Sequence, residues 1–213
     1  ARLRIVEDAR DARLRTLPNL PVSDVPRGNS SADNVVLREV GTKPQFSFSP
    51  RDYLSLAESL DLIDLERAAK VSGSRFGYLK NATVLLEFAL TQFALRRLVK
   101  EGFTPLIPPV MIKADMMRGM GYVDRGSDEE ESYFFEKDDM YLVGTSEQSV
   151  GPMYADEILL ERDLSKRFVA FSTCFRREAG SYGKDTKGIL RVHQFDKLEM
   201  FSLTTPAQSQ KEH

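Results

Sequence analysis

Two long stretches of alternating side chains, joined by a glycine-rich and basic loop, constrain the fold of this chain most strongly. The stretches cover residues 168–178 and 189–201, and the loop covers residues 179–188. Because successive side chains of a strand point to opposite faces, each stretch predicts a strand with two chemically different faces. Together they predict an antiparallel hairpin. The loop lacks the GxxxxGK spacing of a Walker phosphate-binding loop, so it does not predict a phosphate cradle of that kind.

The first stretch separates apolar from small and charged side chains. Arg176 could hold a phosphate or carboxylate through its guanidinium fork, and Glu178 could accept hydrogen bonds from an amine or a purine edge. The alternative is an ordinary Arg/Glu surface pair. We expect the odd positions to form core and the even positions to leave room for a ligand; they are Val169, Phe171, Thr173 and Phe175, against Ala170, Ser172, Cys174, Arg176 and Glu178.

The returning stretch is rich in charge yet centred on an aromatic ring. Phe195 could stack on a base for roughly 1–3 kcal/mol, and the flanking cations could hold phosphates. The alternatives are a core role for Phe195 and a structural hydrogen bond for His193. The side chains that share this parity are Arg191, His193, Phe195, Lys197 and Glu199.

A third predicted strand covers residues 141–147, where alternation would send Thr145 and Glu147 to one face. An ionised carboxylate beside a hydroxyl suits a small polar ligand that carries an ammonium group.

The rest of the sequence predicts a short N-terminal segment followed by one domain. Residues 1–16 show near-helical apolar spacing, and three prolines make residues 17–28 an extended linker. A strand is predicted over 33–40, and a helix over 82–101 that ends at Gly102. A helix opening at Pro50 would carry the core residues Leu54, Leu56, Leu60, Ile63 and Leu65.

Residues 103–111 contain two adjacent prolines in an apolar segment, which predicts an edge strand that a partner subunit could cover. The acidic stretch 127–132 is typical of a solvated loop.

Composition narrows the function classes. Cys174 is the only cysteine and His193 and His213 are the only histidines, so we expect no internal disulfide and no protein-bound zinc. A net charge of −2 argues against a surface that binds nucleic acid throughout. No apolar run approaches the roughly 20 residues that cross a bilayer, and the first residues do not resemble a secretory signal. We expect a cytoplasmic protein without membrane contact.

Several motifs together resemble one family. Residues 175–181 (FRREAGS) and 188–199 (GILRVHQFDKLE) resemble motif 2 of the class II seryl-tRNA synthetases. The similarity extends to 101–109, which is similar to motif 1, to 145–147 and to 71–76. The resemblance implies the class II aminoacyl-tRNA synthetase catalytic fold, incomplete in this chain: an α+β fold in which an antiparallel β-sheet is flanked by helices.

The resemblance also implies a domain division. Residues 1–16 would be the end of an N-terminal tRNA-binding coiled-coil arm, a short helical remnant, and residues 17–28 a linker. Residues 29–213 would be the front part of the catalytic domain, with motifs 1 and 2 but without motif 3, which leaves the chain inactive by itself.

The implied activity is serine–tRNA ligation: ATP, accompanied by Mg²⁺, activates L-serine to seryl-adenylate, and serine passes to tRNA(Ser). The implied catalytic residues are Arg176 and Arg191. L-serine would be bound by Thr145, Ser146, Glu147, Arg176 and Glu199. ATP would be bound by Arg176, Arg177, Glu178, Arg191, Val192, His193, Gln194, Phe195 and Lys197. The family also implies a homodimer through the motif 1 region.

Two alternatives remain open. One is a synthetase-like paralogue that acts as a dimeric scaffold or as an aminoacyl ligase for another carrier. The other is a nucleic-acid-binding module that uses the basic loop with Lys184 and Lys187, although the acidic pI disfavours it. The chain departs from the family at Tyr53, where His is frequent, and at Met120, where Thr is common.

Overall fold

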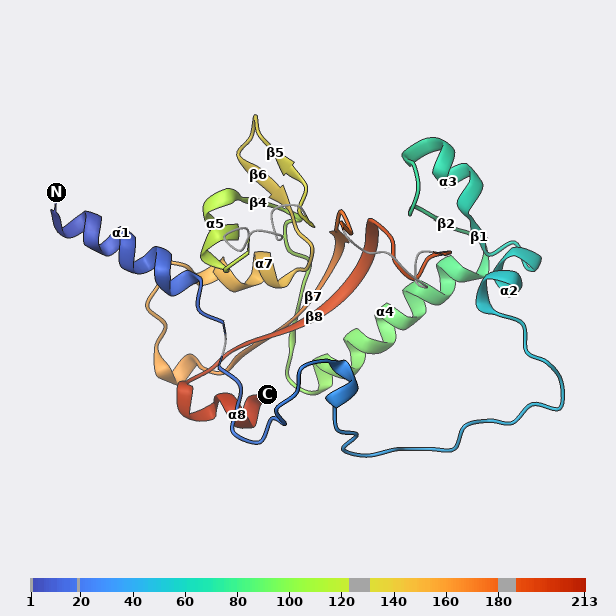
Figure 1. Cartoon of the computed structure of the whole chain (residues 1–213), viewed down its shortest axis with the longest axis horizontal. Helices are drawn as coiled ribbons and strands as arrows, with labels where there is room; N and C mark the ends of the chain where they lie inside the picture. Colours follow the sequence, from blue (N-terminus) through green and yellow to red (C-terminus); the bar gives the residue numbers. More distant parts are fainter. Residues whose placement is uncertain (1, 19, 123–130, 180–186) are drawn as a thin grey trace. The chain divides into compact units, whose positions relative to one another are not determined.

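The computed structural model describes residues 2–18, 20–122, 131–179 and 187–213 (Figure 1). The chain forms two compact units, Ala1–Asp52 and Tyr53–His213. The division into residues 1–16, 17–28 and 29–213 stays a prediction. The predicted acidic loop falls mostly outside the described residues, as does most of the loop between the two long strands. No helix in the described ranges combines the length and the apolar character needed to cross a membrane.

The first unit contains little regular structure besides its first helix. The helix α1, Arg2–Arg15, forms where the apolar spacing predicts it, and a short 3₁₀ helix, Ser31–Asp33, is closed by a reciprocal capping box with Ser30. The predicted strand over 33–40 is wrong, because residues 34–40 have no regular secondary structure. A strand needs a neighbour for its backbone groups, which alternation alone does not supply. Leu37 in this segment is 92% exposed.

The second unit carries all the predicted site residues. Its helices and strands are, in chain order, α2 (Tyr53–Ser59), β1 (Ile63–Asp64), α3 (Leu65–Ser72), β2 (Tyr78–Leu79), α4 (Ala82–Lys100), β3 (Thr104–Leu106), β4 (Met111–Lys113), α5 (Ala114–Gly119), β5 (Phe134–Phe135), β6 (Met140–Leu142), α7 (Glu147–Val150), β7 (Lys166–Phe175), β8 (Gln194–Leu203) and α8 (Ser209–Glu212). Short 3₁₀ helices lie at Gly151–Tyr154, Glu161–Asp163 and Pro206–Gln208.

The single helix expected after Pro50 is wrong, since α2 and α3 are separate helices with β1 between them. Asp61 adopts a positive φ of 53° after α2, and the Asp64 carboxylate caps α3 by accepting from the Arg67 N–H at 2.9 Å. These local hydrogen bonds outweigh the apolar spacing. Of the core expected here, Ile63 is buried but Leu60 is 62% exposed.

The helix α4 confirms the sequence prediction, and the edge strand predicted over 103–111 is confirmed only for β3. The helix ends beside Gly102, whose φ of +89° suits glycine. The strand β3 pairs in parallel with β7 at the edge of the three-stranded sheet β3-β7-β8. The strand β4 lies instead in a second sheet, β4-β6-β5.

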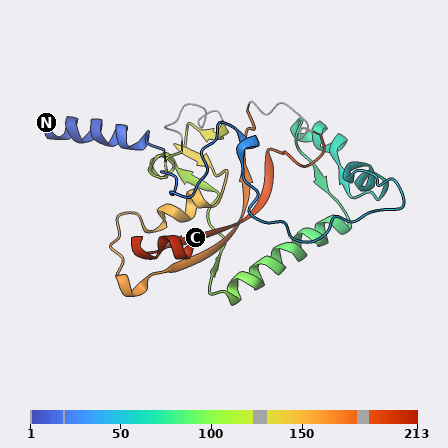
Figure 2. The same cartoon turned by 60° about the horizontal axis from the view of Figure 1, so that its bottom comes forward.

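The predicted hairpin is the antiparallel pair β7 and β8 (Figure 2). Its strands lie a few residues from their expected limits: β7 ends at Phe175, before Arg176, and β8 begins at Gln194, after His193. The register places Cys174 opposite Phe195 and Ser172 opposite Lys197, so these side chains share one face.

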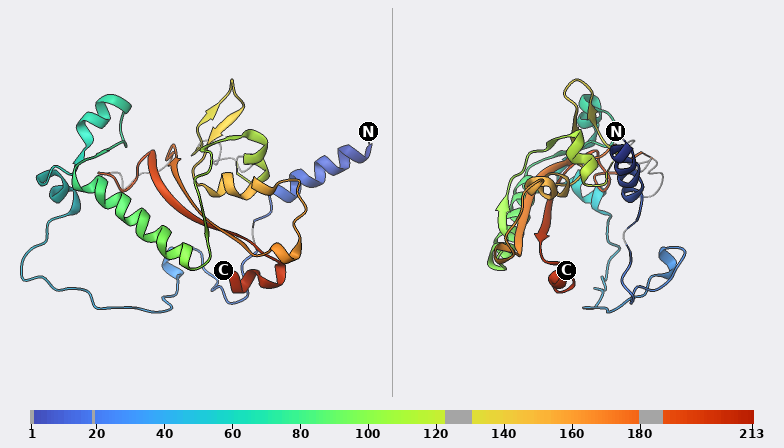
Figure 3. Two further views of the ribbon diagram at one scale, coloured as in Figure 1. Left: turned by 180° about the vertical axis from the view of Figure 1, so that it is seen from behind. Right: turned by 90° about the vertical axis from the view of Figure 1, so that its left-hand side faces the viewer.

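Helices cover both faces of the hairpin (Figure 3). The helix α7 packs on the face with Phe168 and Ala170, through the buried Val150. The helix α4 contacts β3 and β7 and approaches the other face, where the Glu87 carboxyl interacts with that of Asp196. The expected α+β architecture is therefore confirmed.

The expected division of β7 into a core face and an open face is wrong. Val169 at an odd position is fully buried, as expected. The small even residues Ala170, Ser172 and Cys174 are also buried, at 0%, 3% and 0% exposure. The backbone of Ser146, just before α7, interacts with the Cys174 thiol, and Val150 of α7 packs in one buried cluster with Ala170.

Candidate functional site

The segment 144–148 carries three predicted site residues, but it is not a strand. The strand β6 ends at Leu142. The chain then turns: the Gln148 side-chain oxygen accepts from the Gly144 N–H at 2.8 Å, and the Gln148 N–H donates to the Thr145 carbonyl at 3.1 Å. The predicted strand over 141–147 is therefore wrong after Leu142, because local turn bonds close the first turn of α7.

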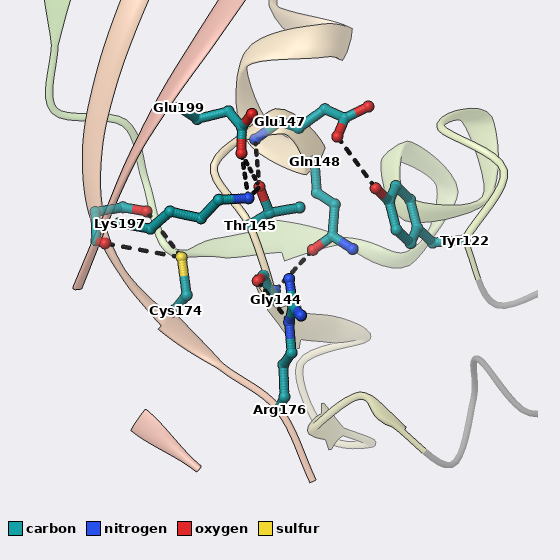
Figure 4. A network of polar contacts seen from close by, with 10 residues as sticks. Tyr122, Gly144, Thr145, Glu147, Gln148, Cys174, Arg176, Lys197 and Glu199 are labelled. Carbon is teal, nitrogen blue, oxygen red and sulfur yellow. Dashed lines mark hydrogen bonds and ion pairs between the residues drawn. The ribbon is translucent and has the colours of Figure 1, made fainter. Parts of the chain in front are cut away.

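Thr145 lies at the centre of a polar network that joins this turn to β8 (Figure 4). Its hydroxyl donates to Glu199 Oε2 at 2.7 Å and accepts from Lys197 Nζ at 3.0 Å. Lys197 also forms an ion pair with Glu199. Burial raises the pKa of Glu199, but the ammonium of Lys197 and the hydroxyl of Thr145 outweigh burial and hold that pKa below its usual range. Glu199 is therefore an ionised acceptor.

The other two residues of the turn differ in accessibility. Glu147 opens α7 and accepts a hydrogen bond from Tyr122 at 3.3 Å. Ser146 is fully buried, and its hydroxyl has no partner among the described residues. Ser146 therefore exposes no surface to the cavity that Thr145 lines, and the structure does not bring it to the other predicted serine-binding residues there.

Arg176 and Phe195 come together where β7 ends. The Arg176 Nε donates to the Gly144 carbonyl at 3.1 Å, and its guanidinium carbon lies 5.4 Å from the centre of the Phe195 ring. A cation over an aromatic face at this distance is attracted to the ring. Arg177 points elsewhere, because its Nε donates to the Ser132 carbonyl at 2.9 Å and its guanidinium lies 5.0 Å from the Tyr133 ring centre.

The residues just before β8 reach the site through a loop rather than through strand alternation. Arg191 donates to Glu178 Oε2 at 2.7 Å, so the two predicted site residues form an ion pair. The His193 Nδ1 lies 2.9 Å from the Arg176 carbonyl, a structural contact. Because Gln194 is the first strand residue, the predicted strand over 189–193 is wrong, and strand alternation does not relate Arg191 and His193 to Phe195.

Two cavities open beside these residues. One of about 520 Å³ adjoins the turn at Thr145; its walls include Tyr122, Gly144, Thr145, Arg176, Glu178 and Arg191. The other, of about 500 Å³, includes Phe76, Glu87, Val192, Gln194 and Phe195 in its walls. The contact between Arg176 and Phe195 joins a residue of the first cavity to a residue of the second.

Two contributors were missed by reasoning from the sequence. The Arg75 Nη1 donates to the Glu178 carbonyl at 2.8 Å, and Tyr122 lines the first cavity. Arg75 lies within the segment 71–76 that carries part of the family resemblance, which was the available signal. Tyr122 lies in a segment with no pattern that indicates a site.

The comparisons with known proteins agree with this arrangement. The model of the tRNA synthetase class II core domain (G, H, P, S and T) matches residues 133–213. The chain is 56% identical over 200 residues to a serine–tRNA ligase of Acidothermus cellulolyticus, covering 94% of this chain and 47% of that protein. It is 52% identical over 206 residues to a serine–tRNA ligase of Nocardia farcinica, covering 95% and 48%. The chain thus spans about half the length of the curated relatives it matches.

Solved structures show the same relation. The crystal structure of seryl-tRNA synthetase from Pyrococcus horikoshii complexed with ATP is 39% identical, with a TM-score of 0.92, and the match covers 100% of this chain and 52% of that one. The cytoplasmic serine–tRNA ligase from Naegleria fowleri in complex with AMP is 30% identical, with a TM-score of 0.87, and the match covers 97% and 49%. The fold is therefore the class II aminoacyl-tRNA synthetase catalytic fold, and the chain belongs to the seryl-tRNA synthetase family.

Proposed function

We propose that this protein is a serine–tRNA ligase. The serine carboxylate would attack the α-phosphorus of ATP in line, forming seryl-adenylate and releasing pyrophosphate. The seryl group would then pass to the 3′ end of tRNA(Ser), releasing AMP. The observation that carries the proposal is the joining of Thr145, Lys197 and Glu199 in one network, on the side of the hairpin where Arg176 meets Phe195.

The amino-acid end of the site would be formed by the turn before α7 and by β8. Glu147 would neutralise the ammonium group of serine, and Thr145 and Glu199 would complete the pocket. Because Lys197 and Thr145 keep Glu199 ionised, this carboxylate is suited to accept a hydrogen bond from the serine hydroxyl. Alanine lacks that hydroxyl and would leave a part-buried carboxylate without this bond, which is the physical basis for rejecting alanine.

The nucleotide would lie between the turn and the segment before β8. Phe195 would stack on the adenine ring and Glu178 would meet its amino group, with Val192, His193 and Gln194 along the ring. Arg176 would bridge the serine carboxylate and the α-phosphate, and Arg191 and Lys197 would face phosphates. The ion pair of Arg191 with Glu178 supports this assignment, because it holds the guanidinium beside the cavity before a phosphate arrives.

Charge neutralisation and alignment are the chemistry that these residues offer. Guanidinium groups stabilise the charge that develops on a transferring phosphoryl group, and no covalent protein nucleophile is needed. Mg²⁺ would come with ATP. Among the described residues no group of three metal-ligating side chains occurs, while Glu131 in the cavity wall could offer the ion an oxygen ligand. When bound, Mg²⁺ would neutralise phosphate charge.

The test is serine-dependent exchange of pyrophosphate into ATP by the complete polypeptide that the gene encodes. We expect Arg176→Ala to abolish exchange and Glu199→Ala to weaken serine use selectively, whereas Arg162→Ala, at a side chain 81% exposed, should retain it. Exchange driven equally well by alanine would contradict the pocket assignment. Exchange without charging of tRNA(Ser) would indicate a ligase for another carrier.

The remaining partners follow from the same proposal. Residues 1–16 would be the end of the arm that binds tRNA(Ser), and the protein would act in the cytoplasm as a homodimer. The dimer would form through residues 103–111, where β3 pairs along one edge only with the strands of the described ranges and Ile107 is 85% exposed. The adjoining α4 exposes Phe88 and Phe93 at 64% and 72%.

Sedimentation tests the dimer. Ile107→Asp should shift the protein toward monomer, because it places a charge at the centre of the interface. Ile158→Asp is the matched control, since Ile158 is 96% exposed and lies outside motif 1. A wild-type protein that sediments only as a monomer would contradict the proposed interface.

A further inference from the structure

Tyr122 joins the hydrophobic core to the wall of the serine pocket. Its ring packs against the buried cluster that contains Met117 and Tyr141. Its hydroxyl donates to Glu147 Oε2 at 3.3 Å (Figure 4), and the residue lines the cavity that Thr145 and Arg176 also line. The ring is therefore fixed on one side while the hydroxyl meets the carboxylate assigned to the ammonium of serine.

The backbone before Tyr122 places the ring. The helix α5 ends at Gly119, and Gly121 turns the chain with a φ of +78°, a conformation that favours glycine. The Tyr122 N–H then donates to the Met117 carbonyl at 3.3 Å, which ties the residue back to α5.

Met120 packs the same turn against the segment that follows α7. It packs so closely over Gly151 that a Cβ built on this glycine would lie 2.3 Å from Met120 Cε, so only glycine fits there without displacing the methionine. The turn 120–122 thus contacts both ends of α7: Tyr122 bonds to Glu147 at its start, and Met120 packs over Gly151 just after its end. This contact gives Met120, where the family commonly has Thr, a packing role.

The phenol keeps its proton under ordinary conditions. Burial, followed by the charge of Glu147, raises the pKa of Tyr122 to about 12. Because the hydroxyl stays protonated and Glu147 offers only acceptors, the hydroxyl is the donor of this bond.

We propose that Tyr122 is a positioning residue for amino-acid binding: its hydroxyl holds the Glu147 carboxylate in the orientation that receives the ammonium of serine. This inference rests on the proposed function. It predicts that losing the hydroxyl impairs the binding of serine and spares the binding of the nucleotide, because Tyr122 acts through Glu147 alone.

The experiment compares Tyr122→Phe with the wild type in the complete polypeptide, by titrating serine and AMP separately. We expect serine to bind about tenfold more weakly, the effect of losing one hydrogen bond to a charged group, and AMP to bind within about twofold of the wild type. The matched control is Tyr154→Phe, since Tyr154 packs against Phe168 near the start of β7, far from Arg176 at the other end. Its serine affinity should not change.

A second pair of variants tests whether Tyr122 acts through Glu147. In a Glu147→Gln background, Tyr122→Phe should change the dissociation constant of serine by less than about twofold, because the charged acceptor is already gone. Equal effects in both backgrounds would overturn the inference, and so would an unchanged serine affinity in Tyr122→Phe or an equal loss of AMP and serine binding. A wild-type protein that binds AMP but not serine would instead refute the proposed function.

Discussion

Replacing Gly188 with alanine tests how Tyr53 holds the turn that leads to the nucleotide site. The Tyr53 hydroxyl donates to the Lys187 carbonyl at 3.0 Å and accepts from the Ile189 N–H at 3.2 Å. Gly188 lies between these two partners, with a φ of +75°, and a Cβ built on it would lie 2.0 Å from the Tyr53 hydroxyl. The alanine must therefore displace the tyrosine.

The cost has two separable parts. A left-handed φ costs a non-glycine residue about 1 kcal/mol. Displacing Tyr53 breaks two exposed neutral hydrogen bonds, which contribute roughly 0.5–1 kcal/mol each. We therefore expect Gly188→Ala to lower the free energy of unfolding in urea by about 2–3 kcal/mol. In a Tyr53→Ala background only the backbone part remains, so the same substitution should cost about 1 kcal/mol.

Gly119→Ala is the matched control, since nothing lies within 4 Å of the added Cβ and no positive φ is involved. Equal costs of Gly188→Ala with and without Tyr53 would refute the reasoning. Such a result would mean that the tyrosine moves aside freely and does not hold the turn. It would also remove the physical account of Tyr53 at a position where the family often has His.

Two further predictions concern a part-buried carboxylate and a buried thiol. Burial opposes the shift, but Lys197 and Thr145 prevail, so folding lowers the pKa of Glu199 below its ordinary value of 4.5. The contribution of Glu199 to stability is therefore present above that value and lost as the pH falls through the folded-state pKa. Urea unfolding should show a steeper loss of stability below pH 4.5 for the wild type than for Glu199→Gln, and parallel curves would contradict this. Burial raises the pKa of the Cys174 thiol, which is 0% exposed, so iodoacetamide should label it only after unfolding, whereas rapid labelling of the folded protein would contradict its placement.

Elements with long sequence patterns were predicted better than elements with short ones. The hairpin of β7 and β8 follows from alternation over about ten residues in each strand, which few other structures satisfy. The parity of Phe195, Lys197 and Glu199 is correct because all three lie within β8. Arg191 and His193 lie before its first residue, where alternation no longer determines direction.

Short apolar patterns failed wherever local hydrogen bonds offered an alternative. The strand expected through 141–147 ends early because Gln148 bonds back to Gly144 and Thr145. The helix expected after Pro50 divides because Asp64 caps a new helix. Contacts such as the one between Arg75 and Glu178 join residues 103 positions apart, so no local pattern could have revealed them.

The small residues of β7 alternate as predicted, but the prediction that they leave room for a ligand is wrong. Their size predicts room for a ligand, yet Ser172 and Cys174 are buried, at 3% and 0% exposure. The Cys174 thiol itself interacts with the backbone of Ser146, and a larger side chain at this position would push the turn away from β8. The hydroxyl of Thr145 would then lose its 2.7 Å contact with Glu199. Small side chains in this strand therefore serve the site indirectly, because they let a second segment of backbone approach closely enough to bring its polar groups to the charged face of β8.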